Sequence, residues 1–143
     1  MLLDIASEPS VTTSDPQTLL LFLPLGYLIT VLIEAPVLVF GLSKNFTFRQ
    51  RLFAGFWLTA CTYPIVVLVL PILFADSSRF LYLLVAETFA PVAECTLFWF
   101  AFRNQLNNDF KTKLRNFAVI TLANLLSFGI GEILNAVSWF GLF

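Results

Sequence analysis

Four long apolar runs divide the chain, and charged residues gather in the short segments between them. Each run is apolar around nearly its whole circumference, whereas a helix of a soluble bundle carries a polar outer face. A helix needs about 20 apolar residues to cross a bilayer core, and every run reaches that length. The pattern predicts an all-α, polytopic membrane protein. Its four transmembrane helices, at approximately 19–42, 52–75, 80–102 and 116–140, would form two helical hairpins.

The segment before the first run, residues 1–18, is polar and acidic and holds no basic residue. A secretory signal peptide begins with positive charge and continues into a short apolar core, and this segment has neither. We therefore expect a retained amino-terminal tail, followed by one transmembrane domain over residues 19–143. Asp15 before Pro16 is a plausible helix start, since proline suits the first helical position.

Basic residues separate the connecting segments into two kinds. Two segments are rich in them, and the remaining connection has only Arg79 beside Asp76. The positive-inside rule places basic segments in the cytoplasm. We therefore expect both termini on the non-cytoplasmic side. The two basic segments hold Lys44, Arg49 and Arg51 after the first run, and Arg103, Lys111, Lys113 and Arg115 after the third.

Composition agrees with a membrane protein and excludes several functions. Of 143 residues, 59% are hydrophobic and 12% are charged, against about 25% charged in soluble domains. The chain is rich in Phe, with 17 copies, and has no His, so we expect neither haem nor zinc. A net charge of −1 gives no reason to expect nucleic acid. We expect no enzyme, because no nucleophile motif accompanies the acidic residues, and we interpret Cys61 and Cys95 as packing residues.

Four glutamates lie inside the apolar runs: Glu34, Glu87, Glu94 and Glu132. Ionisable groups at membrane depth cost roughly 2.5–3.5 kcal/mol each and usually face a bundle interior or a watery cavity. With a rise of 1.5 Å per residue, Glu34 and Glu94 lie roughly 20 Å below the outer surface, and Glu87 and Glu132 roughly 10–12 Å below it. We therefore expect all four to point inwards, in two polar layers.

Hydroxyl and amide side chains of the second and fourth runs reach the depth of the inner glutamates. Oxygen ligands without His or Cys suit protons, Na⁺ or hard divalent cations. Carboxyl groups in a partly dry bundle can also exchange a proton for a cation. The candidate proton or cation site is Glu34, Glu94, Asn124, Thr59 and Thr62, with Glu87 and Glu132 as a candidate outer relay.

The two hairpins look like a weak internal repeat. Each has a deep glutamate on its first helix and a polar motif on its second, since residues 59–64 match residues 124–129 in kind and depth. Parallel repeats related by an axis along the membrane normal are a known transporter arrangement, with the binding site near the midplane.

Short motifs carry a loose resemblance. They are Glu34-Ala35-Pro36, Thr62-Tyr63-Pro64, the paired glutamates of the third run, and Asn124 to Phe128. In these the chain resembles small four-span bacterial integral membrane proteins. The resemblance implies a shared fold and supplies no activity.

Two functions remain open. The first is binding or relaying protons or hard cations through the intramembrane glutamates. The alternative is a non-catalytic structural or accessory subunit of a larger membrane complex, in which the glutamates fix helix packing and the Phe side chains contact lipid, pigment or quinone. Membrane lipid is an expected partner under either hypothesis, as are other membrane subunits or further copies of the chain.

Overall fold

The computed structural model describes residues 16–106 and 109–137, and these residues confirm the all-α class. Four helical stretches are long and apolar enough to cross a membrane. The elements are α1 (Pro16–Gly41), α2 (Phe48–Pro64), the π-helical segment η1 (Ile65–Val69), α3 (Leu70–Leu73), α4 (Arg79–Phe102) and α5 (Phe110–Ala136). Of the expected tail over 1–18, residues 1–15 lie outside the described residues, as do the last residues of the fourth run, and residues 16–18 already belong to α1.

Polar caps explain where the helices begin. The Thr47 hydroxyl accepts a hydrogen bond from the backbone of Gln50, whose side chain accepts one from the backbone of Thr47, so α2 starts with a capping box. Ser78 caps α4. α5 begins six positions before the expected residue 116, because the Asp109 carboxylate caps it. The hydroxyl of Thr112 and the backbone N–H of Lys111 hold the pKa of Asp109 below its usual value.

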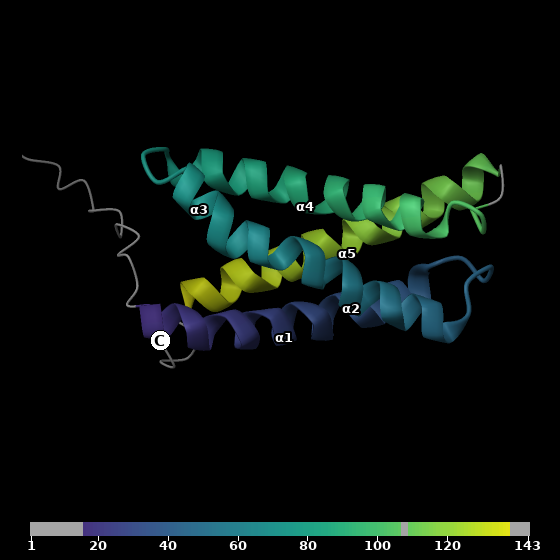
Figure 1. The fold of residues 1–143 in the computed structure, drawn as a ribbon, viewed down its shortest axis with the longest axis horizontal. Helices are drawn as coiled ribbons and strands as arrows, with labels where there is room; N and C mark the ends of the chain where they lie inside the picture. Colours follow the sequence, from purple (N-terminus) through teal and green to yellow (C-terminus); the bar gives the residue numbers. More distant parts are fainter. Residues whose placement is uncertain (1–15, 107–108, 138–143) are drawn as a thin grey trace, which may run out of the picture.

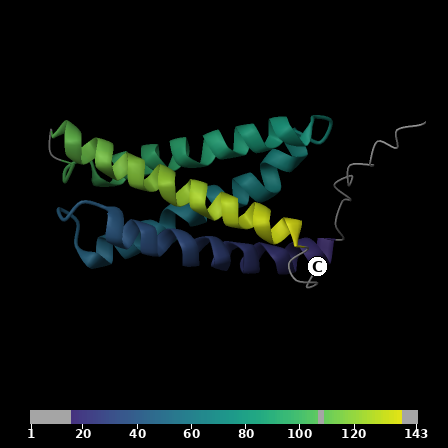
Figure 2. The same ribbon diagram turned by 180° about the vertical axis from the view of Figure 1, so that it is seen from behind.

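α1 and α4 lie along the two long sides of the bundle, and the other helices cross between them. α2, η1 and α3 cross from α1 to α4 on one face (Figure 1). α5 crosses on the opposite face, from α4 to α1 (Figure 2). α2 and α5 therefore each pack against both α1 and α4. The start of α1 and the end of α5 share one end of the bundle, the terminal end, and the α1–α2 and α4–α5 connections share the other, the loop end.

The apolar pattern had suggested one uniform helix for the second span, but the structure divides it into α2, η1 and α3. In η1 the backbone takes the wider π register, in which the N–H of Leu70 bonds the carbonyl of Ile65. The next donor in that register would be Pro71, which has no N–H. The carbonyl of Val66 instead accepts the hydroxyl of Tyr82, on α4, at 3.2 Å. A tyrosine thus satisfies a carbonyl that proline leaves free in a nonpolar setting.

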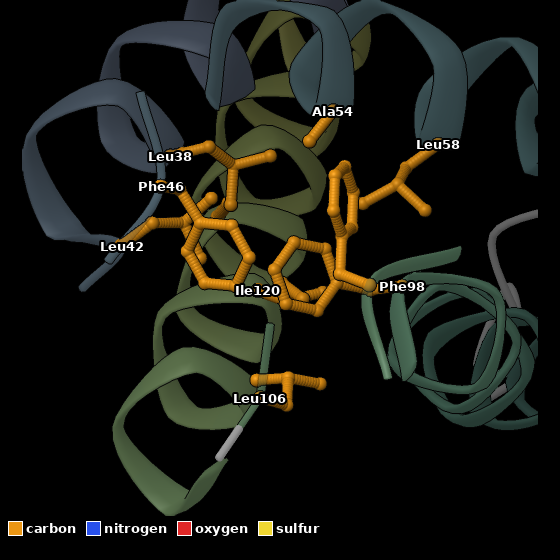
Figure 3. Close-up of a cluster of buried hydrophobic side chains, with 10 residues drawn as sticks. Leu38, Leu42, Phe46, Ala54, Leu58, Phe98, Leu106 and Ile120 are labelled. Carbon is orange, nitrogen blue, oxygen red and sulfur yellow. The ribbon is translucent and has the colours of Figure 1, made fainter. Parts of the chain in front are cut away.

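A cluster of buried apolar side chains fills the bundle between its middle and the loop end (Figure 3). Phe46, Phe98 and Phe102 form its centre, with ring centroids 4.9–5.3 Å apart. We call this cluster the apolar plug. Its members are Leu38, Leu42, Phe46, Ala54, Leu58, Phe98, Phe102, Leu106, Ile120 and Ala123.

Polar side chains hold the end of α1 beside the plug. Arg51 donates to the carbonyls of Phe46 and Val39 at 3.0 and 3.1 Å, and Arg115 donates to that of Gly41 at 3.1 Å. The last carbonyls of a helix have no partner within it and favour a nearby cation. Two of the basic residues that predicted the orientation therefore also cap α1.

The orientation in the membrane stays a prediction with a direct test. In a variant with Cys61 and Cys95 replaced by alanine, single cysteines at the exposed positions Asn45 and Asp76 report the loop end and the terminal end. An impermeant maleimide added to intact cells is expected to label position 76 and to reach position 45 only after permeabilisation. The reverse pattern would place the termini in the cytoplasm.

Candidate functional site

Glu34 lies in the second half of α1, with 2% of its surface exposed. The hydroxyl of Thr59, on α2, contacts its Oε2 at 2.6 Å. The hydroxyl of Ser127, on α5, contacts its Oε1 at 2.5 Å. Both carboxyl oxygens are therefore engaged, each by a different crossing helix.

Glu94 occupies the matching place on α4 and is also 2% exposed. The Thr62 hydroxyl contacts its Oε1 at 2.8 Å, and the side-chain amide of Asn124 donates to its Oε2 at 2.6 Å. The five residues that the sequence grouped as a candidate site thus lie in one hydrogen-bonded cluster. The structure adds Ser127 to that group.

The six side chains form a closed arrangement that we call the carboxyl ring: Glu34, Thr59, Thr62, Glu94, Asn124 and Ser127. Residues three apart on a helix share a face. For that reason α2 can send one threonine to each glutamate, and α5 can do the same with its amide and hydroxyl. Glu34 and Glu94 are close enough to interact electrostatically. The ring ties all four spans together.

A cavity of about 120 Å³ adjoins the ring. Along α1, which runs from the terminal end to the loop end, its lining residues Thr30 and Glu34 precede the plug residue Leu38. The cavity therefore extends from the ring towards the terminal end, and the apolar plug closes the other side. Its lining is Thr30, Glu34, Thr59, Thr62, Tyr63, Val66, Ala86, Glu87, Ala90, Pro91, Glu94, Asn124, Leu125, Ser127 and Phe128.

The cavity is acidic. Among the described residues that line it, Glu34, Glu87 and Glu94 carry carboxyl groups, and none is Lys or Arg. Glu87 is half-buried and lies one helical turn before Pro91, which leaves the Glu87 carbonyl without its usual helical donor. Carboxyl groups withdrawn from water must be neutralised or paired.

The two members of the predicted outer relay lie in different settings. Glu87 lines the cavity. Glu132 does not, and its carboxylate pairs with Arg79 at 2.8 Å near the terminal end, with 33% of its side chain exposed. The expectation that all four glutamates point inwards therefore holds for the deep pair and not for Glu132. Depth along a helix does not say which face a residue occupies.

Burial follows the weak repeat closely. Each of the six buried residues between Arg79 and Leu106 lies 60 positions after a buried residue of the first hairpin, as Glu94 does after Glu34. The pairs are Gly26 with Ala86, Val31 with Pro91, Glu34 with Glu94, Leu38 with Phe98, Leu42 with Phe102 and Phe46 with Leu106.

The hydrogen bonds of the ring obey the same correspondence. Within the hairpins, the Glu34–Thr59 contact matches that of Glu94 with Asn124. Between the hairpins, the Glu34–Ser127 contact matches that of Glu94 with Thr62. The site thus lies where the two halves meet, which is the place expected for a parallel repeat.

Ser127 could have been included from the sequence. It follows Asn124 by three residues, as Thr62 follows Thr59, and it falls at the same depth. The outer position of Glu87 was a sequence signal for the side on which the cavity lies, whereas η1 had no such signal. Comparison with protein-family models, characterised proteins and solved structures gives no match, so geometry alone carries the functional argument.

Proposed function

We propose that this membrane protein binds and exchanges protons or hard cations at the carboxyl ring, through the adjoining cavity. One observation carries the proposal. Two carboxyl groups, each 2% exposed, meet at one cavity whose described lining contains no basic side chain. A site of this kind gains stability when positive charge arrives.

The chemistry of the ring fits small hard ligands. Carboxyl, hydroxyl and amide oxygens are the groups that protons and hard cations prefer. The apolar plug lies directly beyond the ring, so exchange takes place from the terminal end. On the orientation predicted from the basic segments, that is the non-cytoplasmic side.

Removing the charge while keeping the shape tests this proposal. In proteoliposomes, Glu34→Gln and Glu94→Gln are each expected to reduce proton or cation uptake, measured as ligand bound by the protein, to the level of empty vesicles, because an amide cannot take up the charge. Glu132→Gln is the matched control, since it breaks only an exposed ion pair worth at most about 1 kcal/mol. Its uptake is expected to equal that of the unmodified protein.

Two results would contradict the proposal. Uptake unchanged in both ring variants would show that the ring handles no charge. Equal loss in Glu132→Gln would show that the assay reports general damage to the bundle. Size-exclusion profiles of all three variants establish that each is folded before uptake is compared.

A second candidate is a structural or accessory subunit, and one observation favours it. Every carboxyl oxygen of the ring already has a partner within the bundle, as a purely structural polar cluster requires. Under this proposal Glu94→Gln leaves a host complex active, whereas Glu94→Leu impairs assembly by deleting the hydrogen bonds. Purification from native membranes in mild detergent separates the two, because only a subunit brings a stoichiometric partner with it.

A further inference from the structure

Each hydroxyl group of the ring lies within hydrogen-bond distance of two acceptors. A hydroxyl carries one hydrogen and can also accept. The Thr59 oxygen lies 2.6 Å from Oε2 of Glu34 and 2.8 Å from the carbonyl oxygen of Gly55, one turn back on its own helix. Its single hydrogen can serve only one of them at a time.

The other two hydroxyls are placed in the same way. Thr62 lies 2.8 Å from Oε1 of Glu94 and 3.1 Å from the carbonyl of Leu58. Ser127 lies 2.5 Å from Oε1 of Glu34 and 3.0 Å from the carbonyl of Asn124. All three therefore have one hydrogen and two acceptors within reach.

The fourth partner differs in kind. The amide nitrogen of Asn124 has two hydrogens, and its two neighbours are Oε2 of Glu94 at 2.6 Å and the carbonyl of Ile120 at 3.0 Å. Both hydrogens are used, and the group can only donate. It therefore favours the ionised form of Glu94, because a charged carboxylate oxygen accepts a hydrogen bond more strongly than the carbonyl oxygen of a neutral carboxyl group.

We propose that the ligand of the ring is the proton, and that Thr59, Thr62 and Ser127 are hydroxyl switches that serve both charge states of the glutamates. Beside a carboxylate, the hydroxyl donates to it. When a proton from the cavity binds the carboxylate, an O–H bond forms there and that group becomes the donor. The hydroxyl then accepts and turns its own hydrogen to its helix carbonyl. The covalent O–H bond of the hydroxyl stays intact throughout, and only its hydrogen-bond acceptor changes. This inference rests on the proposed function and restricts its ligand from protons or hard cations to the proton.

Other titratable groups surround the ring, and the test must hold them constant. From the elements packed against the two glutamates they are Tyr27, Cys61, Tyr63, Glu87 and Cys95. All are retained in every variant below, so differences between variants report the ring.

Infrared spectroscopy of the reconstituted full-length protein separates a switch from a fixed donor. The measured quantity is the ratio of neutral to ionised carboxyl at fixed pH, with Glu34→Gln and Glu94→Gln used to assign the bands. Asn124→Leu removes a donor that stabilises the ionised form more than the neutral one, so the ratio for Glu94 is expected to rise about tenfold. Thr62→Val removes a partner from both forms, so the ratio is expected to stay near that of the unmodified protein. Thr62→Ser should match it throughout.

The infrared ratio of the Thr62→Val variant decides whether Thr62 is a switch or a fixed donor. A rise with Thr62→Val as large as with Asn124→Leu would make Thr62 a fixed donor and overturn the switch. Where Asn124→Leu does not fold, Thr62→Val and Ser127→Ala are compared with the unmodified protein, and a tenfold rise in either has the same meaning.

The ligand is tested in the same samples. Lowering the pH is expected to raise the neutral carboxyl band, while Na⁺ or Ca²⁺ at constant pH leaves it unchanged. A cation-induced change in the carboxylate bands would overturn the proton as ligand and leave the proposed function standing. No response of the assigned bands to pH or to either cation would overturn the proposed function itself.

Discussion

Replacing Gly55 with leucine is expected to prevent the four helices from assembling. A Cβ atom at Gly55 would lie 2.8 Å from the Cα of Ala35 and 2.9 Å from its Cβ. The nearer atom belongs to the backbone of α1, so no rotamer change relieves the clash and the two helices must separate. We expect a loss of roughly 3 kcal/mol or more, at or above the upper end of overpacking in well-packed interiors.

The carboxyl ring would suffer from the same change. The Gly55 carbonyl accepts from Thr59, which also contacts Glu34 at 2.6 Å, so separating α1 from α2 breaks the ring on that side. Thermal unfolding in detergent, followed by size-exclusion chromatography, measures the effect. Gly131→Leu is the matched control, because a Cβ atom there meets nothing within 4 Å. Equal stability of the two leucine variants would contradict the close contact between α1 and α2.

Truncating Phe98 is expected to destabilise the bundle nearly as much and to change its permeability. This side chain is 0% exposed and packs edge-on against Phe46 at 5.3 Å, at the centre of the apolar plug. Removing a buried phenylalanine ring typically costs about 3–5 kcal/mol, because the cavity left behind only partly collapses. Phe98→Ala should lower the unfolding temperature markedly.

The same truncation opens space between the ring and the loop end. We therefore expect vesicles containing folded Phe98→Ala to leak protons faster than those with the unmodified protein. Phe100→Ala is the control, since this neighbour is 58% exposed on the outer side of α4. It should change stability by no more than about 0.5 kcal/mol, as is usual for surface substitutions. Proton leaks of similar rate in the Phe98→Ala and Phe100→Ala vesicles would mean that the plug does not seal the bundle.

The membrane spans and the deep pair could be predicted because both follow from position along a helix. Twenty apolar residues set a span, and a constant rise per residue sets the depth of Glu34 and Glu94 and of their partners. Rotation about the helix axis is less constrained, since each span is apolar all round. For this reason depth counting placed Glu132 with Glu87, whereas Arg79 at the start of α4 draws Glu132 into a separate ion pair.

Other features depend on contacts that a single sequence does not reveal. The polar residues Thr30, Tyr63 and Glu87 mark the flank of the ring on which the cavity lies, but the volume left open there depends on helix packing. The early start of α5 depends on Asp109, which stabilises a charged first turn that a search for apolar residues excludes. The π register of η1 depends on the backbone around Pro71, together with the hydroxyl that Tyr82 supplies from α4.

The correspondence between the two hairpins has a mechanical consequence. In a dimer of identical hairpins, both halves would be equally stiff, whereas one continuous chain lets each half acquire its own tightness. Gly55 allows α1 and α2 to touch along their backbones, whereas the match of residues 59–64 with 124–129 puts the bulky Ile120 at the corresponding position, and α4 and α5 pack less extensively against each other. The first hairpin is therefore the more closely packed half. We therefore expect any movement that widens the cavity to displace the second hairpin, which carries Glu94 and Glu87, more readily than the first.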